Sequence, residues 1–309
     1  MSAETSTSTV LEEPLDDLDI DSQSWGLDIG LRHPVFRGVG WKAGVSATLS
    51  RRHTKTSLLG VPFTFASGAN EGVTDVAVIR LGQDLLVRDA RRVIALRSTF
   101  NFGTNLFHAT RNEGDLPDGQ FVSWLGQAQL AHKPFDTEAS LVARLHVQRT
   151  SRRLLPLEQF SIGGANSVRG YRENQFIRDE GVTASVEARI PLFDLGLPGV
   201  ETETEPGPVA LALFADTGWA WTTGAPLSRY EDIHSIGFGF RWDPSRGCMR
   251  RSTPHGRSSL WRTRRTADCR TTAYTSASLS AFRERGSRAK GGGPGRTRTC
   301  NQTVMSGQL

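Results

Sequence analysis

Apolar and polar residues alternate with a period of two along most of the chain. In the first clear case, large apolar residues occupy the odd positions from Trp25 to Leu31, and glycine or charged residues occupy the even positions from Gly26 to Arg32. Such alternation predicts β-strands with one apolar and one polar face. Nine segments show it: Trp25–Arg32, Trp41–Ser50, Thr74–Leu86, Val93–Thr104, Gln120–Leu130, Ser140–Gln148, Val182–Ile190, Val209–Asp216 and Ile233–Trp242.

The connections between these segments are alternately short and long. Turns such as "VRDAR" and "AHKPFDTE" are compact, whereas "NLFHATRNEGDLPDG" and the segment Thr150–Gly181 are long. Strands of about ten residues with short turns at one end and long loops at the other are typical of a transmembrane β-barrel. In hydrocarbon every backbone N–H and C=O must pair with a neighbouring strand, so the sheet must close on itself, with lipid outside and water inside.

The composition of the two strand faces favours a barrel over a soluble β-sandwich. Large, charged or amide side chains occupy the register expected to face the lumen: Arg97, Gln127, Gln129, Arg144, His146, Gln148, Glu187 and Arg189. The opposite register is apolar and includes Trp124, Phe100 and Leu145. Most tryptophans fall near strand ends, where an interfacial aromatic girdle would lie. A soluble Greek-key or sandwich domain with the same alternation remains the alternative.

The basic charge of the chain comes from its C-terminal part. The formal net charge is +5, which by itself favours a nucleic acid or an anionic membrane surface as partner. From Ser245 to Leu309, however, there are 14 of the 37 Lys and Arg residues and 2 of the 32 Asp and Glu residues. Residues 1–244 therefore hold 23 basic and 30 acidic residues, a net charge of −7. We expect no nucleic-acid partner.

The chain shows neither a transmembrane helix nor a secretory signal. No run of 18 or more apolar residues occurs. The first residues are acids and hydroxyls where a signal would have a basic and then an apolar region, so we expect the export signal of such a protein to be missing from this sequence. We interpret residues 1–24 as a disordered acidic segment.

Residues 245–309 differ in character from the rest of the chain. They are rich in arginine and serine, have no period, and hold all three cysteines, so the main body has no disulfide framework or cysteine metal site. In a shifted codon frame, Asp268–Arg283 can encode an alternating segment that ends on phenylalanine before a stop, as a final outer-membrane strand does. We therefore interpret this tail as disordered and as the product of a frameshift near Pro244–Gly247. A basic nucleic-acid-binding tail is the alternative.

The loop before the strand Val182–Ile190 carries the most specific motif. The stretch "GGANSVRGY" (Gly163–Tyr171) resembles the loop motif of the outer-membrane polypeptide-transport barrel superfamily, a Val/Ile-Arg-Gly-Tyr/Phe tetrapeptide on a long loop folded into the lumen. The blocks "LLPLEQF", "ASVEARIPLF", "LALFADTGWA" and "SIGFGFRWDP" stand in the order of the haemolysin-activator family of two-partner secretion transporters. Over residues 25–244 the chain is similar to that family.

The resemblance implies a latch between the loop and the barrel wall. The loop residues of this latch would be Val168, Arg169, Gly170 and Tyr171. In the family the loop arginine reaches an aspartate of a Phe-x-Asp-x-Gly block on the inner wall, matched here by Phe214, Asp216 and Gly218. Alternation independently places Asp216 on the inner face, and a guanidinium–carboxylate pair is strong in a partly desolvated lumen.

The other residues of this region would support the same loop. Gly170 would allow a tight turn, Tyr171 would pack on the wall, and Glu187 and Arg189 would face the lumen as further partners of the loop. Without the resemblance, Arg169 would be interpreted as a solvated loop cation and Asp216 as a turn residue.

By this resemblance the chain is a translocator that exports an unfolded exoprotein of the haemolysin or adhesin type across the outer membrane. Its expected partners are that exoprotein and membrane lipid, with no enzymatic activity, cofactor, metal or small-molecule substrate. The alternative is an outer-membrane protein assembly factor of the same superfamily, and a passive porin would need no latch. A complete family member would have about sixteen strands. We therefore expect this chain to be a fragment, non-functional alone.

Overall fold

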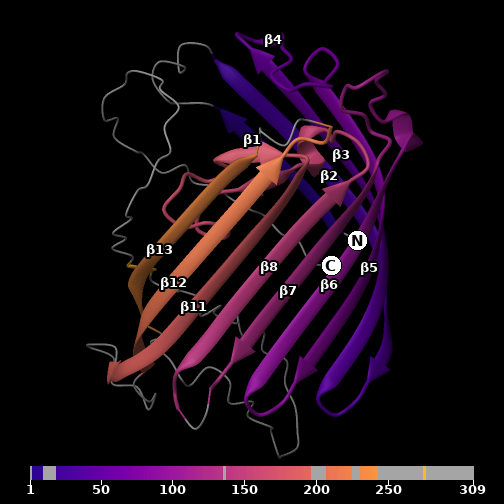
Figure 1. Cartoon of the computed structure of the whole chain (residues 1–309). Helices are drawn as coiled ribbons and strands as arrows, with labels where there is room; N and C mark the ends of the chain where they lie inside the picture. The colour runs from indigo at the N-terminus through magenta and orange to yellow at the C-terminus, as the bar shows by residue number, and fades with distance from the viewer. Residues whose placement is uncertain are drawn as a thin grey trace, which may run out of the picture.

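Twelve strands of the described residues form one curved antiparallel sheet (Figure 1), and two short strands form a separate pair. The computed structural model describes residues 2–9, 19–134, 137–195, 207–224, 230–242 and 274–275. The strands of this sheet are β1 (Ser2–Thr9), β2 (Ile20–Arg37), β3 (Trp41–Leu58), β4 (Val61–Pro62), β5 (Val73–Arg88), β6 (Arg92–Thr104), β7 (Val122–His132), β8 (Ser140–Thr150), β11 (Glu180–Leu195), β12 (Gly207–Trp221), β13 (Glu231–Trp242) and β14 (Tyr274–Thr275). Apart from β4, which pairs with β3, each pairs with the next in this order.

All nine strands expected from alternation are present, and several are longer than the alternating segments. β2 and β3 pair without interruption from Ile20↔Leu58 to Leu31↔Ala47 and beyond, although alternation is lost in "RRHTKTS" at the end of β3. Backbone pairing does not depend on which side chains alternate, so a strand can continue where both of its faces are polar. The all-β antiparallel prediction is confirmed, and within the described residues the sheet is open, with β1 and β14 at its edges.

The pairing register places the predicted polar side chains on one face. Gln127 lies opposite Arg97 on one side and His146 on the other, and Gln129 lies opposite Arg144. The alternate positions form the outer face, where large apolar side chains such as Leu96, Phe100 and Leu145 are exposed. One polar and one apolar face is the pattern expected for the wall of a transmembrane β-barrel.

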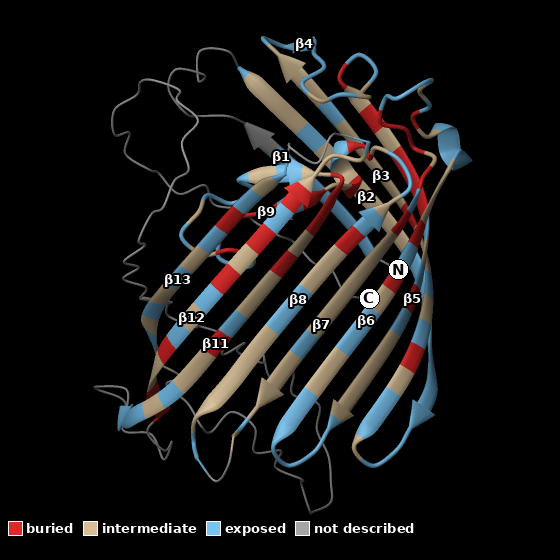
Figure 2. Ribbon diagram, in the orientation of Figure 1, coloured by how far each residue is buried: buried red, intermediate tan, exposed pale blue. Residues whose placement is uncertain are grey.

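The inner face is not polar throughout, contrary to the simple expectation that it faces water. Val76 and Val78 of β5 lie on it in line with Arg80, yet both are almost fully buried. They are covered by residues of the loop between β8 and β11, which packs on the inner face. Figure 2 shows most of the buried positions toward the end of the sheet where the long loops lie, and others along the length of β12.

The N-terminal segment departs from the expectation of disorder. Ser2–Thr9 forms strand β1, paired with β2 from Ser2↔Asp28 to Thr9↔Asp21, and β2 already begins at Ile20. The free edge of β2 offers backbone donors and acceptors, and the β-branched threonines of "SAETSTST" suit an extended strand. Residues 10–18 lie outside the described residues.

Most of the C-terminal tail also lies outside the described residues, so the expectations about its disorder and frameshift apply to a part that the structure does not describe. Tyr274 and Thr275 form β14 and pair with Arg241 and Phe240 of β13. Among the described residues, no helix has the length and apolar character required to span a membrane.

Candidate functional site

The loop between β8 and β11 has two parts, both of which pack on the inner face of the sheet. The first part, residues 151–159, contains the short 3-10 helix η3 (Pro156–Glu158). The second part is a hairpin in which β9 (Phe160–Ile162) pairs with β10 (Phe176–Arg178). The tip of this hairpin contains the "GGANSVRGY" motif. Gly163 and Gly164 (φ +106° and +97°) and Gly170 (φ +88°) occupy left-handed conformations that only glycine adopts readily.

Arg169 at the hairpin tip binds Asp216 of β12 in a bidentate ion pair. Its Nε and Nη2 donate to Asp216 Oδ2 and Oδ1 at 2.6 and 2.7 Å. The Arg169 backbone N–H also donates to Oδ2, at 3.1 Å. Ser185, which faces Asp216 in the register of β11 and β12, donates its hydroxyl to Oδ1 at 2.7 Å. The Asp216 side chain is fully buried, and these four bonds satisfy its charge.

Glu187 is the second carboxylate under the loop and forms ion pairs with three arginines. Arg169 Nη1 donates to Glu187 Oε2 at 2.5 Å. Arg189, two residues further along the same face of β11, donates from Nε to Oε1 at 2.7 Å. Arg241 of β13 places its Nε 2.9 Å from the same Oε1. The site therefore joins one loop arginine and two wall arginines through a single carboxylate.

An aromatic ring completes the seat of the guanidinium. The Cζ of Arg169 lies 3.6 Å from the centroid of the Phe214 ring, a cation–π contact. Phe214 faces Glu187 across β11 and β12, and its ring lies over Gly237 of β13. A Cβ at Gly237 would lie 2.5 Å from the ring, so the absence of a side chain there lets Phe214 lie flat beneath Arg169.

Apolar contacts hold the residues on either side of Arg169. Val168 is fully buried in a cluster with Phe160, Ile162, Ala220 and Ile233. Gly218 on β12 makes this possible, because a Cβ there would lie 3.0 Å from Val168 Cγ2. Tyr171 packs against the same cluster and donates its hydroxyl to the backbone oxygen of His234 at 3.0 Å.

The surroundings of Arg169 keep it charged. Burial alone would lower the pKa of its guanidinium, but the hydrogen bonds and charges of Asp216 and Glu187 outweigh this cost and raise the pKa above the ordinary value. Among the described residues, no group of three or more His, Cys, Asp or Glu side chains could hold a metal ion. The arrangement thus binds one segment of the chain to another through fixed charges.

The structure brings together every residue that the sequence proposed for this site. Val168, Arg169, Gly170 and Tyr171 lie on the hairpin tip, and Phe214, Asp216, Gly218, Glu187 and Arg189 lie on the wall beneath it. Sequence reasoning missed Ser185 and Arg241. Ser185 shares the inward register with Glu187 and could have been found from alternation, whereas the position of Arg241 depends on the pairing of a third strand.

A curved sheet of long amphipathic antiparallel strands, with a charged loop bound to its inner face, has the architecture of an outer-membrane β-barrel transporter. The family model described as "Haemolysin secretion/activation protein ShlB/FhaC/HecB" matches residues 2–242. The chain therefore belongs to this family of outer-membrane transporters of two-partner secretion, as its sequence motifs indicated.

Comparisons with individual proteins agree with this assignment. The chain is 28% identical, over 174 residues, to the outer membrane transporter CdiB of Escherichia coli O6:K15:H31 (strain 536 / UPEC), a match that covers 55% of this chain and 28% of the relative. The chain thus spans about a quarter of that relative's length. The solved structure of CdiB from Escherichia coli has the same fold, with a TM-score of 0.62 and 23% identity over 77% of this chain and 42% of that one. CdiB from Acinetobacter baumannii aligns with a TM-score of 0.56 and 14% identity, covering 77% of this chain and 40% of that one.

Proposed function

We propose that this chain belongs to an outer-membrane translocator that exports an unfolded exoprotein in two-partner secretion. The observation that carries the proposal is the bidentate pair between Arg169 of the loop and the fully buried Asp216 of the wall. A passive pore has no need for a loop bound to its inner wall by buried charges. A translocator does, because a loop held in this way closes the path when no client is passing.

The client in this proposal is an extended polypeptide of the haemolysin or adhesin type. Such a chain can pair its backbone with an exposed strand edge while it passes, which requires neither nucleotide nor metal. The proposal therefore includes no enzymatic step, cofactor, nucleic acid or small-molecule substrate. Membrane lipid covers the outer face, where side chains such as Ile236 and Phe240 are exposed.

We also propose that the chain acts as one part of a larger barrel and is not functional alone. Within the described residues the sheet does not close, and the chain covers less than half of the solved transporter that shares its fold. An open sheet edge in hydrocarbon leaves backbone groups unpaired at a cost of several kcal/mol each, about the penalty for any buried polar group without a partner. The missing pairs would come from further strands.

The test places each substitution in the complete, full-length transporter and measures export of the exoprotein encoded beside its gene. We expect Arg169→Ala and Asp216→Ala each to reduce the client in the medium by about tenfold or more, because each leaves one partner of a buried charge pair alone. Arg178→Ala is the control, since Arg178 pairs with Glu231 of β13 where both side chains are about one third exposed. Outer-membrane levels of each variant are measured in parallel. Near-normal export by both Arg169→Ala and Asp216→Ala would remove the latch from the mechanism.

A further inference from the structure

A second charged contact joins the loop to the sheet, far along the wall from Arg169. Glu158 is the last residue of η3, in the first part of the loop. Its Oε1 accepts a hydrogen bond from Arg80 Nη2 at 2.6 Å, and its Oε2 accepts one from Arg80 Nη1 at 2.9 Å. Arg80 lies on the inner face of β5, whereas Asp216 lies on β12. In the order of the sheet, β6, β7, β8 and β11 stand between these two strands. The polarity is reversed, since here the wall supplies the arginine and the loop supplies the carboxylate.

This second pair is buried and supported by polar neighbours. The Glu158 side chain is 5% exposed and that of Arg80 is 21% exposed. Arg80 Nη1 also donates to Asn101 Oδ1 of β6 at 3.0 Å, and Asn101 in turn donates to Ser123 of β7 at 3.1 Å. The pair is therefore held in place by β5, β6 and β7, of which β7 also contacts the cluster around Val168 through Leu125.

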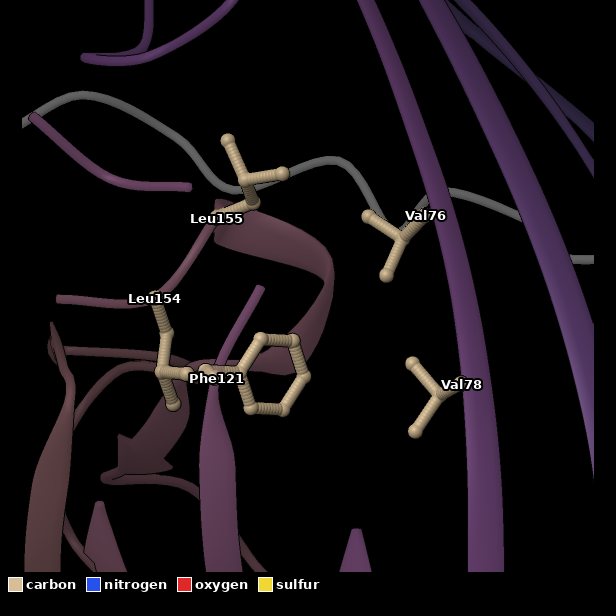
Figure 3. Close-up of a cluster of buried hydrophobic side chains, with 5 residues drawn as sticks. All are labelled: Val76, Val78, Phe121, Leu154 and Leu155. Atoms are coloured by element: carbon tan, nitrogen blue, oxygen red, sulfur yellow. The ribbon is translucent and has the colours of Figure 1, made fainter. Parts of the chain in front are cut away.

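Apolar packing holds the same part of the loop to the same strands. Leu154 and Leu155 are fully buried against Val76 and Val78 of β5 and against Phe121. Figure 3 shows the two valines pointing from β5 toward Phe121 and the two leucines. The inward apolar positions of β5, which have no place in a water-filled lumen, are thus explained as the seat of this segment.

The two contacts hold different parts of the loop. Glu158 belongs to the first part, and Arg169 belongs to the hairpin that begins at Phe160. Gln148 of β8 donates to the backbone oxygens of Glu158 and Asp179, at 2.9 and 3.0 Å, and so fixes the base of the loop next to this boundary. The hairpin joins this base at both of its ends, at Gln159 and at the buried Asp179, and Gln159 Nε2 donates to Asp179 Oδ1 at 3.0 Å.

We propose that Arg80 and Glu158 form a permanent anchor that keeps the first part of the loop on β5 and β6 when the Arg169 contact opens. In this proposal the hairpin moves about its two ends, at residues 159 and 179, and the loop does not leave the lumen. Arg80 and Glu158 are positioning residues in this proposal. The proposal rests on the proposed function only for the purpose of the hairpin's movement, which would be to open the path for the client. The anchor itself is a property of the folded chain.

The test is segment-resolved hydrogen exchange on the complete transporter that contains this chain, in lipid vesicles with no client present. We expect Arg169→Ala to speed exchange in the tip, residues 163–175, and to leave residues 154–159 protected. Glu158→Gln, which keeps side-chain volume and removes the charge, should speed exchange in residues 154–159 by about tenfold or more, as expected when a buried charge pair loses one partner. Arg80→Ala should have the same effect.

Two further variants make the outcome specific. Arg97→Ala removes an arginine of β6 that lies on the same inner face of the sheet as Arg80, and it should leave the exchange of the loop amides unchanged. Arg80→Glu combined with Glu158→Arg restores the pair with exchanged charges and should recover part of the protection lost in the single variants. Release of residues 154–159 by Arg169→Ala alone, or no effect of Glu158→Gln and Arg80→Ala, overturns the proposal. Failure of the exoprotein export assay would leave these exchange results unchanged, so the two proposals fail separately.

Discussion

Replacement of Asp216 by alanine gives the sharpest measure of how firmly the hairpin tip is held. The substitution removes both side-chain bonds from Arg169, the bond from its backbone N–H and the bond from Ser185. Loss of one partner from a buried ion pair costs about 3–5 kcal/mol. Arg169 is 24% exposed and keeps its bond to Glu187, so we expect a smaller cost of about 2–4 kcal/mol.

This free energy can be read from the exchange of backbone amides in the tip. When the loop opens and closes rapidly, the exchange rate follows the population of the open form. With about 1.4 kcal/mol for each factor of ten, the expected cost corresponds to an increase of about 30- to 700-fold in the exchange rate of residues 163–175. The complete transporter in lipid vesicles is the sample, and exchange of β11 and β12 reports whether the sheet is intact.

Arg178→Ala is the matched control for this measurement. Arg178 lies in the same hairpin and pairs with Glu231 at 3.0 Å, but the two side chains are 33% and 37% exposed. Exposed pairs contribute about 0.2–1 kcal/mol, so the increase should stay below about fivefold. Equal effects of Asp216→Ala and Arg178→Ala would refute the reasoning that burial makes the Asp216 pair strong.

Three further predictions concern packing around the tip and on the outer face. Gly218→Leu would push against Val168, which already lies 3.0 Å from the position of a Cβ, and should loosen the tip by about 1–3 kcal/mol in the same exchange measurement. Val168→Ala removes two fully buried methyl groups and should weaken tip protection by a similar amount, about 1–3 kcal/mol. Ile236→Arg on the outer face should lower the free energy of unfolding of the complete transporter in lipid vesicles by about 2–4 kcal/mol, as measured by urea titration. Gly239→Arg is its control on the inner face of the same strand, where the space is open, and should cost less than about 1 kcal/mol; similar losses for both would contradict the assignment of the two faces.

The sequence predicted the strands well because apolar and polar residues alternate wherever the two faces of a strand lie in different surroundings. It failed where surroundings change along one strand. The inner face of β5 carries Val76 and Val78 beneath the loop and then Arg80, so a rule of one apolar and one polar face does not hold there. Strand β1 was missed because its serines and threonines are polar on both faces, and its pairing with β2 depends on a free backbone edge.

The candidate site was predicted through a motif, and what lay outside the motif was missed. Arg169 and Asp216 stand in recognisable blocks, so their pairing could be inferred before any geometry was known. Glu158 also stands in a matched block, "LLPLEQF", but its partner Arg80 is 78 residues away in a strand without a distinctive pattern. A contact between a loop and a distant strand depends on how the sheet curves, which local periodicity does not encode.

The balance of positive and negative side chains at the Arg169 site affects whether the hairpin can bind again after it leaves the wall. Docked, the site holds three cations, Arg169, Arg189 and Arg241, and two anions, Glu187 and Asp216. Departure of the hairpin takes away one cation and leaves the wall neutral, with Glu187 still bonded to two arginines. Only Asp216 then lacks a cationic partner, and it remains as a single vacant acceptor for the returning guanidinium. Under the proposed function, the wall therefore offers the returning hairpin the same acceptor after each departure.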